Sequence, residues 1–146
     1  LGKYEDAASC YEEALAIHRA MSNRVMQSVS LTELGTAYLK AERFADAERA
    51  LREAMTVAGD GHSIEPMVVV ALVSALDGQG KHGDAAEVLR PFIELLSKQA
   101  ADVGTLIEAM QLRAEQLEAA GLMQDAGEQR AAIERVKSGG SSEARE

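Results

Sequence analysis

The stretch Glu42-Arg43-Phe44-Ala45-Asp46-Ala47 decides the fold, because three variants of it recur along the 146-residue chain. The other copies are Gly2-Lys3-Tyr4-Glu5-Asp6-Ala7, Gly80-Lys81-His82-Gly83-Asp84-Ala85 and Gly121-Leu122-Met123-Gln124-Asp125-Ala126. The alanines that close the copies, at positions 7, 47, 85 and 126, are 40, 38 and 41 residues apart. A period of this length indicates a stack of similar helical or strand units, and such arrays usually work by presenting a surface.

The residues around the Ala47 copy predict two helices. After it, Leu51 and Ala54 stand four and seven positions downstream, which places them on one helical face. Before it, a second helix carries apolar or small residues at Leu31, Leu34, Gly35 and Tyr38. The aspartate that precedes each closing alanine falls in a first helical turn, where a carboxylate suits the helix dipole and can cap free N–H groups. Each copy therefore predicts an antiparallel helix pair around a short turn.

The composition favours an all-α chain and excludes several partners. Aromatic residues make up only 3%, there is no tryptophan, and proline occurs twice. The formal net charge of −9 argues against nucleic acid, whose phosphates need a basic surface. No apolar run approaches the roughly 20 residues that span a bilayer, so no membrane partner is expected. The single cysteine, Cys10, is expected to be a buried or half-buried thiol and favours a reducing compartment.

We expect a right-handed superhelical array, an α-solenoid, of about three and a half antiparallel helix pairs over residues 1–137. The predicted boundaries are a partial first repeat at 1–20, a second repeat at 25–59, a third at 64–98, and a fourth, C-terminal capping repeat at 102–137. Pro91 lies inside the second helix of the third repeat and should kink or break it. Residues 138–146 are rich in glycine and serine and are expected to be a disordered tail.

The phased positions resemble the tetratricopeptide repeat. The second copy matches best, through Leu34-Gly35, Tyr38, Phe44, Ala47, Leu51 and Ala54. The first copy supplies only the second helix of a pair, the third has His82 where an aromatic is usual, and the fourth has Arg113 and Arg130 in place of apolar residues. The period exceeds the family's usual value of about 34 and is similar to the longer-helix variety of kinesin light chains and bacterial regulatory proteins. This likeness favours a bacterial, cytoplasmic protein.

The resemblance implies a non-catalytic scaffold that binds a peptide or protein segment in a concave groove lined by the first helices of the pairs. The implied contact residues are Thr32, Thr36, Leu39 and Lys40 in the second repeat, Val70, Ser74 and Asp77 in the third, and Gln111, Glu115 and Glu118 in the fourth. The family's carboxylate clamp of Lys, Arg and Asn is absent at these positions. Because the groove becomes acidic in the fourth repeat, a basic or amphipathic partner is expected.

Two alternative functions stay open. The first repeat lacks its first helix, so Tyr4, Ala7 and Tyr11 are expected to form an uncovered apolar surface for self-association into a homo-oligomer. According to the other alternative, the chain is the sensor or regulatory module of a larger signalling or transcription-regulating protein. No enzyme is expected, because the three histidines share no metal-ligand spacing and Ser63 has no recognisable base beside it. Accordingly no catalytic residue, metal or cofactor is assigned.

Overall fold

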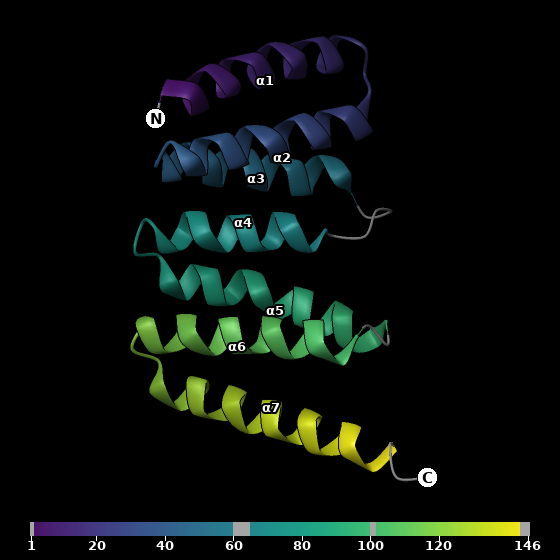
Figure 1. Cartoon of the computed structure of the whole chain (residues 1–146), viewed down its shortest axis with the longest axis vertical. Coiled ribbons are helices and arrows are strands. Elements are labelled where there is room, and N and C mark those ends of the chain that lie inside the picture. Colours follow the sequence, from purple (N-terminus) through teal and green to yellow (C-terminus); the bar gives the residue numbers. More distant parts are fainter. Residues whose placement is uncertain (1, 60–64, 100–101, 144–146) are drawn as a thin grey trace. The chain divides into compact units, whose positions relative to one another are not determined.

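The computed structural model describes residues 2–59, 65–99 and 102–143, and these ranges contain seven α-helices and no strand. The helices, labelled in Figure 1, are α1 (Gly2–Ala20), α2 (Arg24–Lys40), α3 (Phe44–Ala58), α4 (Pro66–Asp77), α5 (His82–Lys98), α6 (Val103–Ala119) and α7 (Met123–Glu143). The predicted fold class, an all-α array of helical repeats of the solenoid kind, is confirmed. Within the described ranges, no helix combines the length and the apolar content needed to cross a bilayer.

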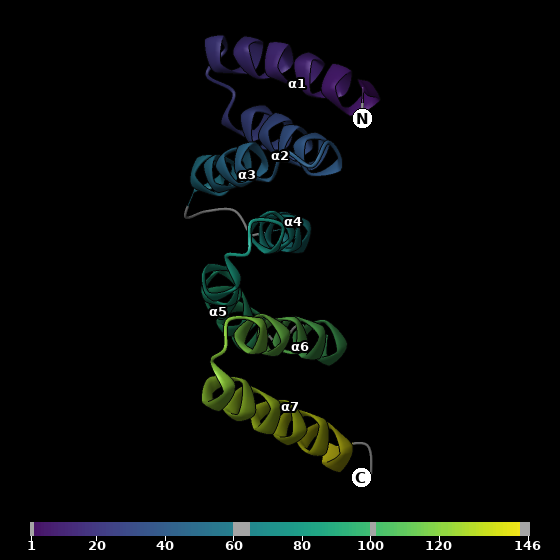
Figure 2. The same ribbon diagram turned by 90° about the vertical axis from the view of Figure 1, so that its left-hand side faces the viewer.

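The chain forms two compact units, residues 1–80 and 81–146. The boundary falls inside the predicted third repeat, just after the turn residue Gly80. In the first unit α2 packs on both α1 and α3, while α3 also packs on α4. Figure 2 shows α2 and α4 of this unit on one side and α3 on the other. In the second unit α6 packs on both α5 and α7.

The core of the first unit depends on a close approach of α2 and α3. Gly35 faces Leu51, and a Cβ atom at position 35 would lie only 2.6 Å from Leu51 Cγ. Non-bonded carbon atoms prefer separations of about 3.5–4.0 Å, so only glycine fits there without displacing Leu51. Leu51 itself is fully buried, as is Leu31 on the same helix as Gly35. The small residue at Gly35 therefore sets how closely the two helices pack.

Three of the four turn copies contain a residue in the left-handed backbone region. Gly80 and Gly121 have φ angles of 71° and 78°, and Glu42 has a φ of 59°. In the Glu42 turn the backbone N–H of Arg43 donates to the carbonyl of Tyr38 at 2.8 Å, which closes the end of α2. Glycine adopts this conformation without a steric penalty, whereas a side chain at Glu42 is strained.

A polar network ties α1 to α2 and to the start of α3. The Tyr38 hydroxyl donates a hydrogen bond to Glu12, and the guanidinium carbon of Arg43 lies 4.5 Å from the centre of the Tyr38 ring. Arg43 also pairs with Glu5 at 2.9 Å and with Asp46 at 2.6 Å. Asp46 thus lies in the first turn of α3 as predicted, but its carboxylate binds arginine instead of capping the helix. Burial of the phenol and its hydrogen bond with Glu12 raise the pKa of Tyr38 to about 12.

The second unit has hydrogen-bonded polar side chains in its interior. Gln116 and Gln129 are only 7% and 9% exposed. Arg113 Nε donates to the carbonyl of Ala86 at 3.2 Å, and Arg113 Nη1 donates to Gln129 Oε1. His82, predicted to pack in place of an aromatic residue, is half-buried with its Nδ1 3.1 Å from Gln116 Oε1. Since buried polar groups need hydrogen-bond partners, this network takes the place of apolar packing.

Three predictions from the sequence are wrong in whole or in part. Pro91 does not break α5, which continues as one helix, because the proline lies on the exposed side and removes a single backbone donor. A kink at Pro91 stays a prediction. α7 continues to Glu143, so residues 138–143 are helical and not part of a disordered tail; residues 144–146 lie outside the described ranges. Cys10 is exposed, because α1 turns Ala8 and Leu15 toward its neighbours and the cysteine away from them.

Replacing Glu42 by glycine should raise the free energy of unfolding by about 1 kcal/mol. The left-handed conformation costs a residue with a side chain about 1–2 kcal/mol, and the greater freedom of glycine in the unfolded chain offsets part of the gain. Urea denaturation monitored by circular dichroism measures the change. The matched control, Gly121→Ala, should shift the midpoint in the opposite direction, and an unchanged midpoint for Glu42→Gly would contradict the strain argument.

The raised pKa of Tyr38 predicts a loss of stability in strong base. The folded-state pKa of about 12 lies above the ordinary value of 10.0, so the protonated phenol stabilises the fold fully below pH 10. This contribution is lost as the pH rises through 12. We therefore expect the free energy of unfolding to fall more steeply between pH 10 and pH 12 in the unchanged protein than in Tyr38→Phe. Equal slopes in urea titrations of the two proteins would rule out this role.

Candidate interaction surface

Two helices of the first unit, α2 and α4, each expose a stripe of side chains. Both helices begin at the same end of the unit in Figure 1, and contacts between them are direct. The Asn23 side chain accepts a hydrogen bond from the backbone N–H of Met26 at the start of α2, while Pro66 begins α4. Because α3 packs against both helices, the exposed stripes lie away from α3, on one side of the unit.

We define the α2–α4 face by the exposed and half-buried side chains that recur at helical spacing on these two stripes. They are Val29, Thr36, Leu39 and Lys40 on α2, and Met67, Val70, Ser74 and Asp77 on α4. On α4 the apolar Met67 and Val70 stand toward the N-terminal end and the polar Ser74 and Asp77 toward the C-terminal end, whereas on α2 the apolar Leu39 lies beside Lys40 at the C-terminal end. The face therefore offers an apolar region beside a polar one, along two helices that run in the same direction.

Most of the groove residues predicted in the first unit lie on this face, with one exception. Thr32 is only 6% exposed, and its hydroxyl donates to the Ser28 carbonyl at 2.9 Å, so it cannot reach a partner. Thr36 is half-buried, with its hydroxyl turned back to the carbonyl of Thr32 at 2.9 Å. The Ser74 side chain is exposed, but its hydroxyl likewise donates to its own helix. These hydroxyls are satisfied locally, so they contribute shape more than directed hydrogen bonds.

Two apolar residues of the face were missed from the sequence. Val29 is 48% exposed and Met67 is 57% exposed, and each lies one helical turn before a residue that was predicted. Val70, which was predicted, is 48% exposed beside them on α4. Met67 could have been predicted from the sequence, because Met67, Val70 and Ser74 follow one another at intervals of three and four residues and so share one helical face. Val29, Met67 and Val70 are the exposed large apolar side chains of the face.

The charged end of the face includes a cation held over an aromatic ring. Lys40 Nζ lies 5.7 Å from the centre of the Tyr4 ring of α1, within the range of a cation–π contact. Asp77 is exposed at the corresponding end of α4. One positive and one negative side chain therefore stand at the C-terminal ends of the two helices, beside the apolar region.

The predicted groove residues of the second unit lie along α6. Gln111 and Glu115 are exposed, and Glu118 is half-buried with its carboxylate 2.8 Å from Arg130 of α7. Glu108, not predicted from the sequence, is exposed at the same helical spacing. The exposed stripe of α6 thus carries three carboxylates, one of which is neutralised within the unit.

The residues predicted for self-association have more cover than expected. Tyr4 is 40% exposed, whereas Ala7 and Tyr11 are half-buried. The Tyr11 hydroxyl reaches Glu33 of α2 at 3.4 Å, and the Tyr4 ring lies below Lys40. Their contacts with α2 correct the expectation that they lack any cover from the rest of the chain. The more exposed apolar side chains of this region are Ile17 and Met21.

The side chains that could bind a metal ion are dispersed over the described ranges. There, no three His, Cys, Asp or Glu side chains are placed to hold one metal ion. His18 Nδ1 lies 3.3 Å from the Ala14 carbonyl, within its own helix. His62 and Ser63, considered from the sequence, lie outside the described residues.

Comparisons with known proteins agree with this architecture. Residues 1–60 match the family model of the tetratricopeptide repeat. Two crystal structures of a Podosopora anserina kinesin light chain with nearly identical TPR-like repeats, one of them a substituted form, have the same fold. Their TM-scores are 0.75 and 0.74 at 18% sequence identity; the alignments cover 97% and 93% of this chain and 70% and 68% of those chains. No curated protein matches the sequence. The predicted resemblance to the tetratricopeptide repeat is confirmed.

Proposed function

We propose that this tetratricopeptide-repeat protein is a non-catalytic module whose α2–α4 face binds one segment of a partner protein. Such repeats generally mediate protein–protein interaction. The observation that carries the proposal is the exposure of three apolar side chains, Val29, Met67 and Val70, on two helices that contact each other. Apolar side chains grouped on an exposed face mark an interaction site more than isolated ones do.

The chemistry of the face indicates an amphipathic segment. The apolar side chains of Met67 and Val70 can bury one or two apolar residues of a partner, and methionine adapts its shape to different ligands. In the second unit, considered by itself, the exposed carboxylates of Glu108 and Glu115 give α6 an acidic stripe of its own, and the net charge of −9 favours basic residues in a partner of either unit. We therefore propose a partner segment with apolar anchors and flanking lysines or arginines.

Removing the apolar side chains should weaken binding of a fluorescein-labelled amphipathic Leu–Lys peptide. We expect the double variant Met67→Ser and Val70→Ser to lower the affinity by at least about tenfold, because full burial of one such side chain contributes about 1.5–3 kcal/mol. Fluorescence anisotropy measures the binding. The matched control, Met123→Ser, removes a similarly exposed methionine, 66% exposed, from the start of α7 and should leave the affinity unchanged. A loss of the same size in the control would contradict the assignment of the face.

The electrostatic part of the proposal is tested in the same assay. Glu108→Lys combined with Glu115→Lys should weaken the basic peptide, whereas Glu94→Lys on α5 should have a smaller effect. Glu118 is a poorer choice, because reversing its charge also breaks its ion pair with Arg130. If the double variant Glu108→Lys and Glu115→Lys binds the peptide as tightly as the unchanged protein, the proposed electrostatic contribution of these carboxylates is contradicted.

Self-association through α1 is a second candidate function, favoured by the exposure of Ile17 at 60% and Met21 at 69%. We expect sedimentation coefficients to rise with protein concentration, and the double variant Ile17→Ser and Met21→Ser to abolish that rise. A monomer over the whole concentration range would eliminate this candidate. Because neither residue belongs to the α2–α4 face, the peptide-binding assay remains an independent measurement.

A further inference from the structure

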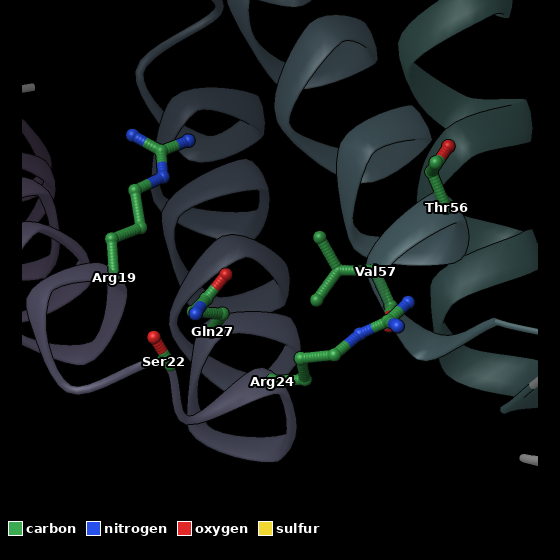
Figure 3. A pocket seen from close by; sticks show the side chains of 6 residues that line it. All are labelled: Arg19, Ser22, Arg24, Gln27, Thr56 and Val57. Carbon is green, nitrogen blue, oxygen red and sulfur yellow. The ribbon is translucent and has the colours of Figure 1, made fainter.

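The first unit contains an open pocket of about 460 Å³ at the turn between α1 and α2 and the C-terminal end of α3 (Figure 3). Its lining residues are Arg19, Ser22, Arg24, Gln27, Thr56 and Val57. None of them belongs to the α2–α4 face, so the pocket is a separate feature of the unit. In Figure 3 the two arginine side chains border opposite ends of the pocket, with Ser22 and Gln27 between them.

Each arginine is fixed by a contact with α3. Arg19 pairs with Glu53, and both side chains are about half exposed. Arg24 donates from Nε and Nη2 to the carbonyl of Val57, at 3.3 Å and 3.1 Å. In the part of the chain that the structure describes, no carboxylate lies within ion-pair distance of Arg24. Among the described residues the pocket thus has two guanidinium groups and one nearby carboxylate, in a chain whose net charge is −9.

Hydrogen-bond donors remain available in the pocket. A guanidinium group carries five N–H donors, and Arg24 uses two of its own on Val57. Among described residues the Ser22 hydroxyl has no hydrogen-bond partner, and Ser22 is held in the left-handed region with a φ of 53°. Anchoring of Arg24 by Val57 limits the motion of the guanidinium, so less side-chain entropy is lost when a ligand binds.

We propose that this pocket binds acidic side chains of an extended partner segment. The Arg19–Glu53 pair shows that a carboxylate is accepted there, and guanidinium groups bind carboxylates through paired hydrogen bonds. Counted over the described residues, the pocket has one positive charge in excess, which suits a monoanionic carboxylate better than a dianionic phosphate. Since the pocket is open and much larger than one carboxylate, it admits a side chain together with the backbone that carries it. The methyl groups of Val57 offer contact to the methylenes of a bound glutamate.

In this arrangement Glu53 competes with the ligand for Arg19. Neutralising it by Glu53→Gln frees the guanidinium without removing a positive charge, so the variant binds an acidic segment more tightly. A merely structural role of the Arg19–Glu53 pair does not predict that increase. The direction of the Glu53→Gln effect therefore separates a binding pocket from an ion pair that only joins α1 to α3.

The test uses a fluorescein-labelled hexaglutamate peptide and the whole chain at low salt, with hexaglutamine as the uncharged control peptide. We expect Arg24→Gln to weaken hexaglutamate binding about tenfold, since a charge-assisted hydrogen bond contributes on that scale. Arg49→Gln makes the same change in net charge on the outer side of α3, where its side chain is 76% exposed, and should leave binding unchanged. Glu53→Gln should tighten binding severalfold. Hexaglutamine should not bind.

Several outcomes would overturn the proposal. Equal losses for Arg24→Gln and Arg49→Gln would indicate a diffuse charge effect. Displacement of the peptide by inorganic phosphate at similar concentration would indicate a site for small oxyanions, and Arg24-dependent binding to vesicles of anionic lipid in place of the peptide would indicate a membrane contact. If Arg24→Gln fails to fold, the double variant Arg19→Gln and Glu53→Gln retains Arg24, and it must bind hexaglutamate more weakly than Glu53→Gln alone.

Discussion

The first unit depends on the absence of a side chain at Gly35. Without a Cβ there, Leu51 fits against α2, and the two helices approach closely beside the buried part of α2, which extends from Ser30 to Tyr38. That close approach fixes α3 behind both α2 and α4, so each of these helices turns its exposed stripe in the same direction. The position of the candidate interaction face is therefore a consequence of helix packing at a residue that does not belong to it.

The same packing places Tyr38 where it connects three helices. Its hydroxyl binds Glu12 of α1, its ring lies below Arg43, and Arg43 in turn binds Glu5 of α1. α1 has few buried apolar side chains of its own, with Ala8 and Leu15 as its buried residues. Polar contacts at the C-terminal end of α2 and the turn after it therefore supply much of the specificity with which α1 lies on α2. Exposed ion pairs add little stability individually, whereas the buried Tyr38 hydroxyl needs its partner.

Much of the fold follows from the sequence, because the turn copies and the helical spacing of apolar residues are local patterns. The left-handed turn residue is an example, since Gly80 and Gly121 occupy the position where the second copy has Glu42. Exposure depends on contacts between distant residues and is harder to predict. Thr32 has the spacing of a groove residue but is buried in the packed unit. The helix through Pro91 shows that an exposed backbone position tolerates the loss of one hydrogen bond.

The candidate site was predictable in part, because some of its residues lie on one face of a single helix. Val70 and Ser74 lie on a face that helical periodicity identifies, and Met67 could have been added by extending that periodicity one turn toward the N-terminus. The arginine pocket could not be found in this way, because its residues come from α1, the following turn, α2 and α3. Arg24 and Val57 are far apart in the sequence, so their hydrogen bonds cannot be predicted from a local pattern.

The polar interior of the second unit limits how freely its helices can be exchanged. Arg113 of α6 is matched to Gln129 of α7 and to a carbonyl of α5, and Gln116 is matched to His82. A first helix taken from a pair in the first unit would bring a leucine, Leu34 or Leu72, to the place of Arg113 and leave the buried Gln129 without its donor. Repeat proteins are often treated as modular units that can be shuffled or shortened by recombination. In this chain the last three helices form a matched set, and they would have to be transferred together.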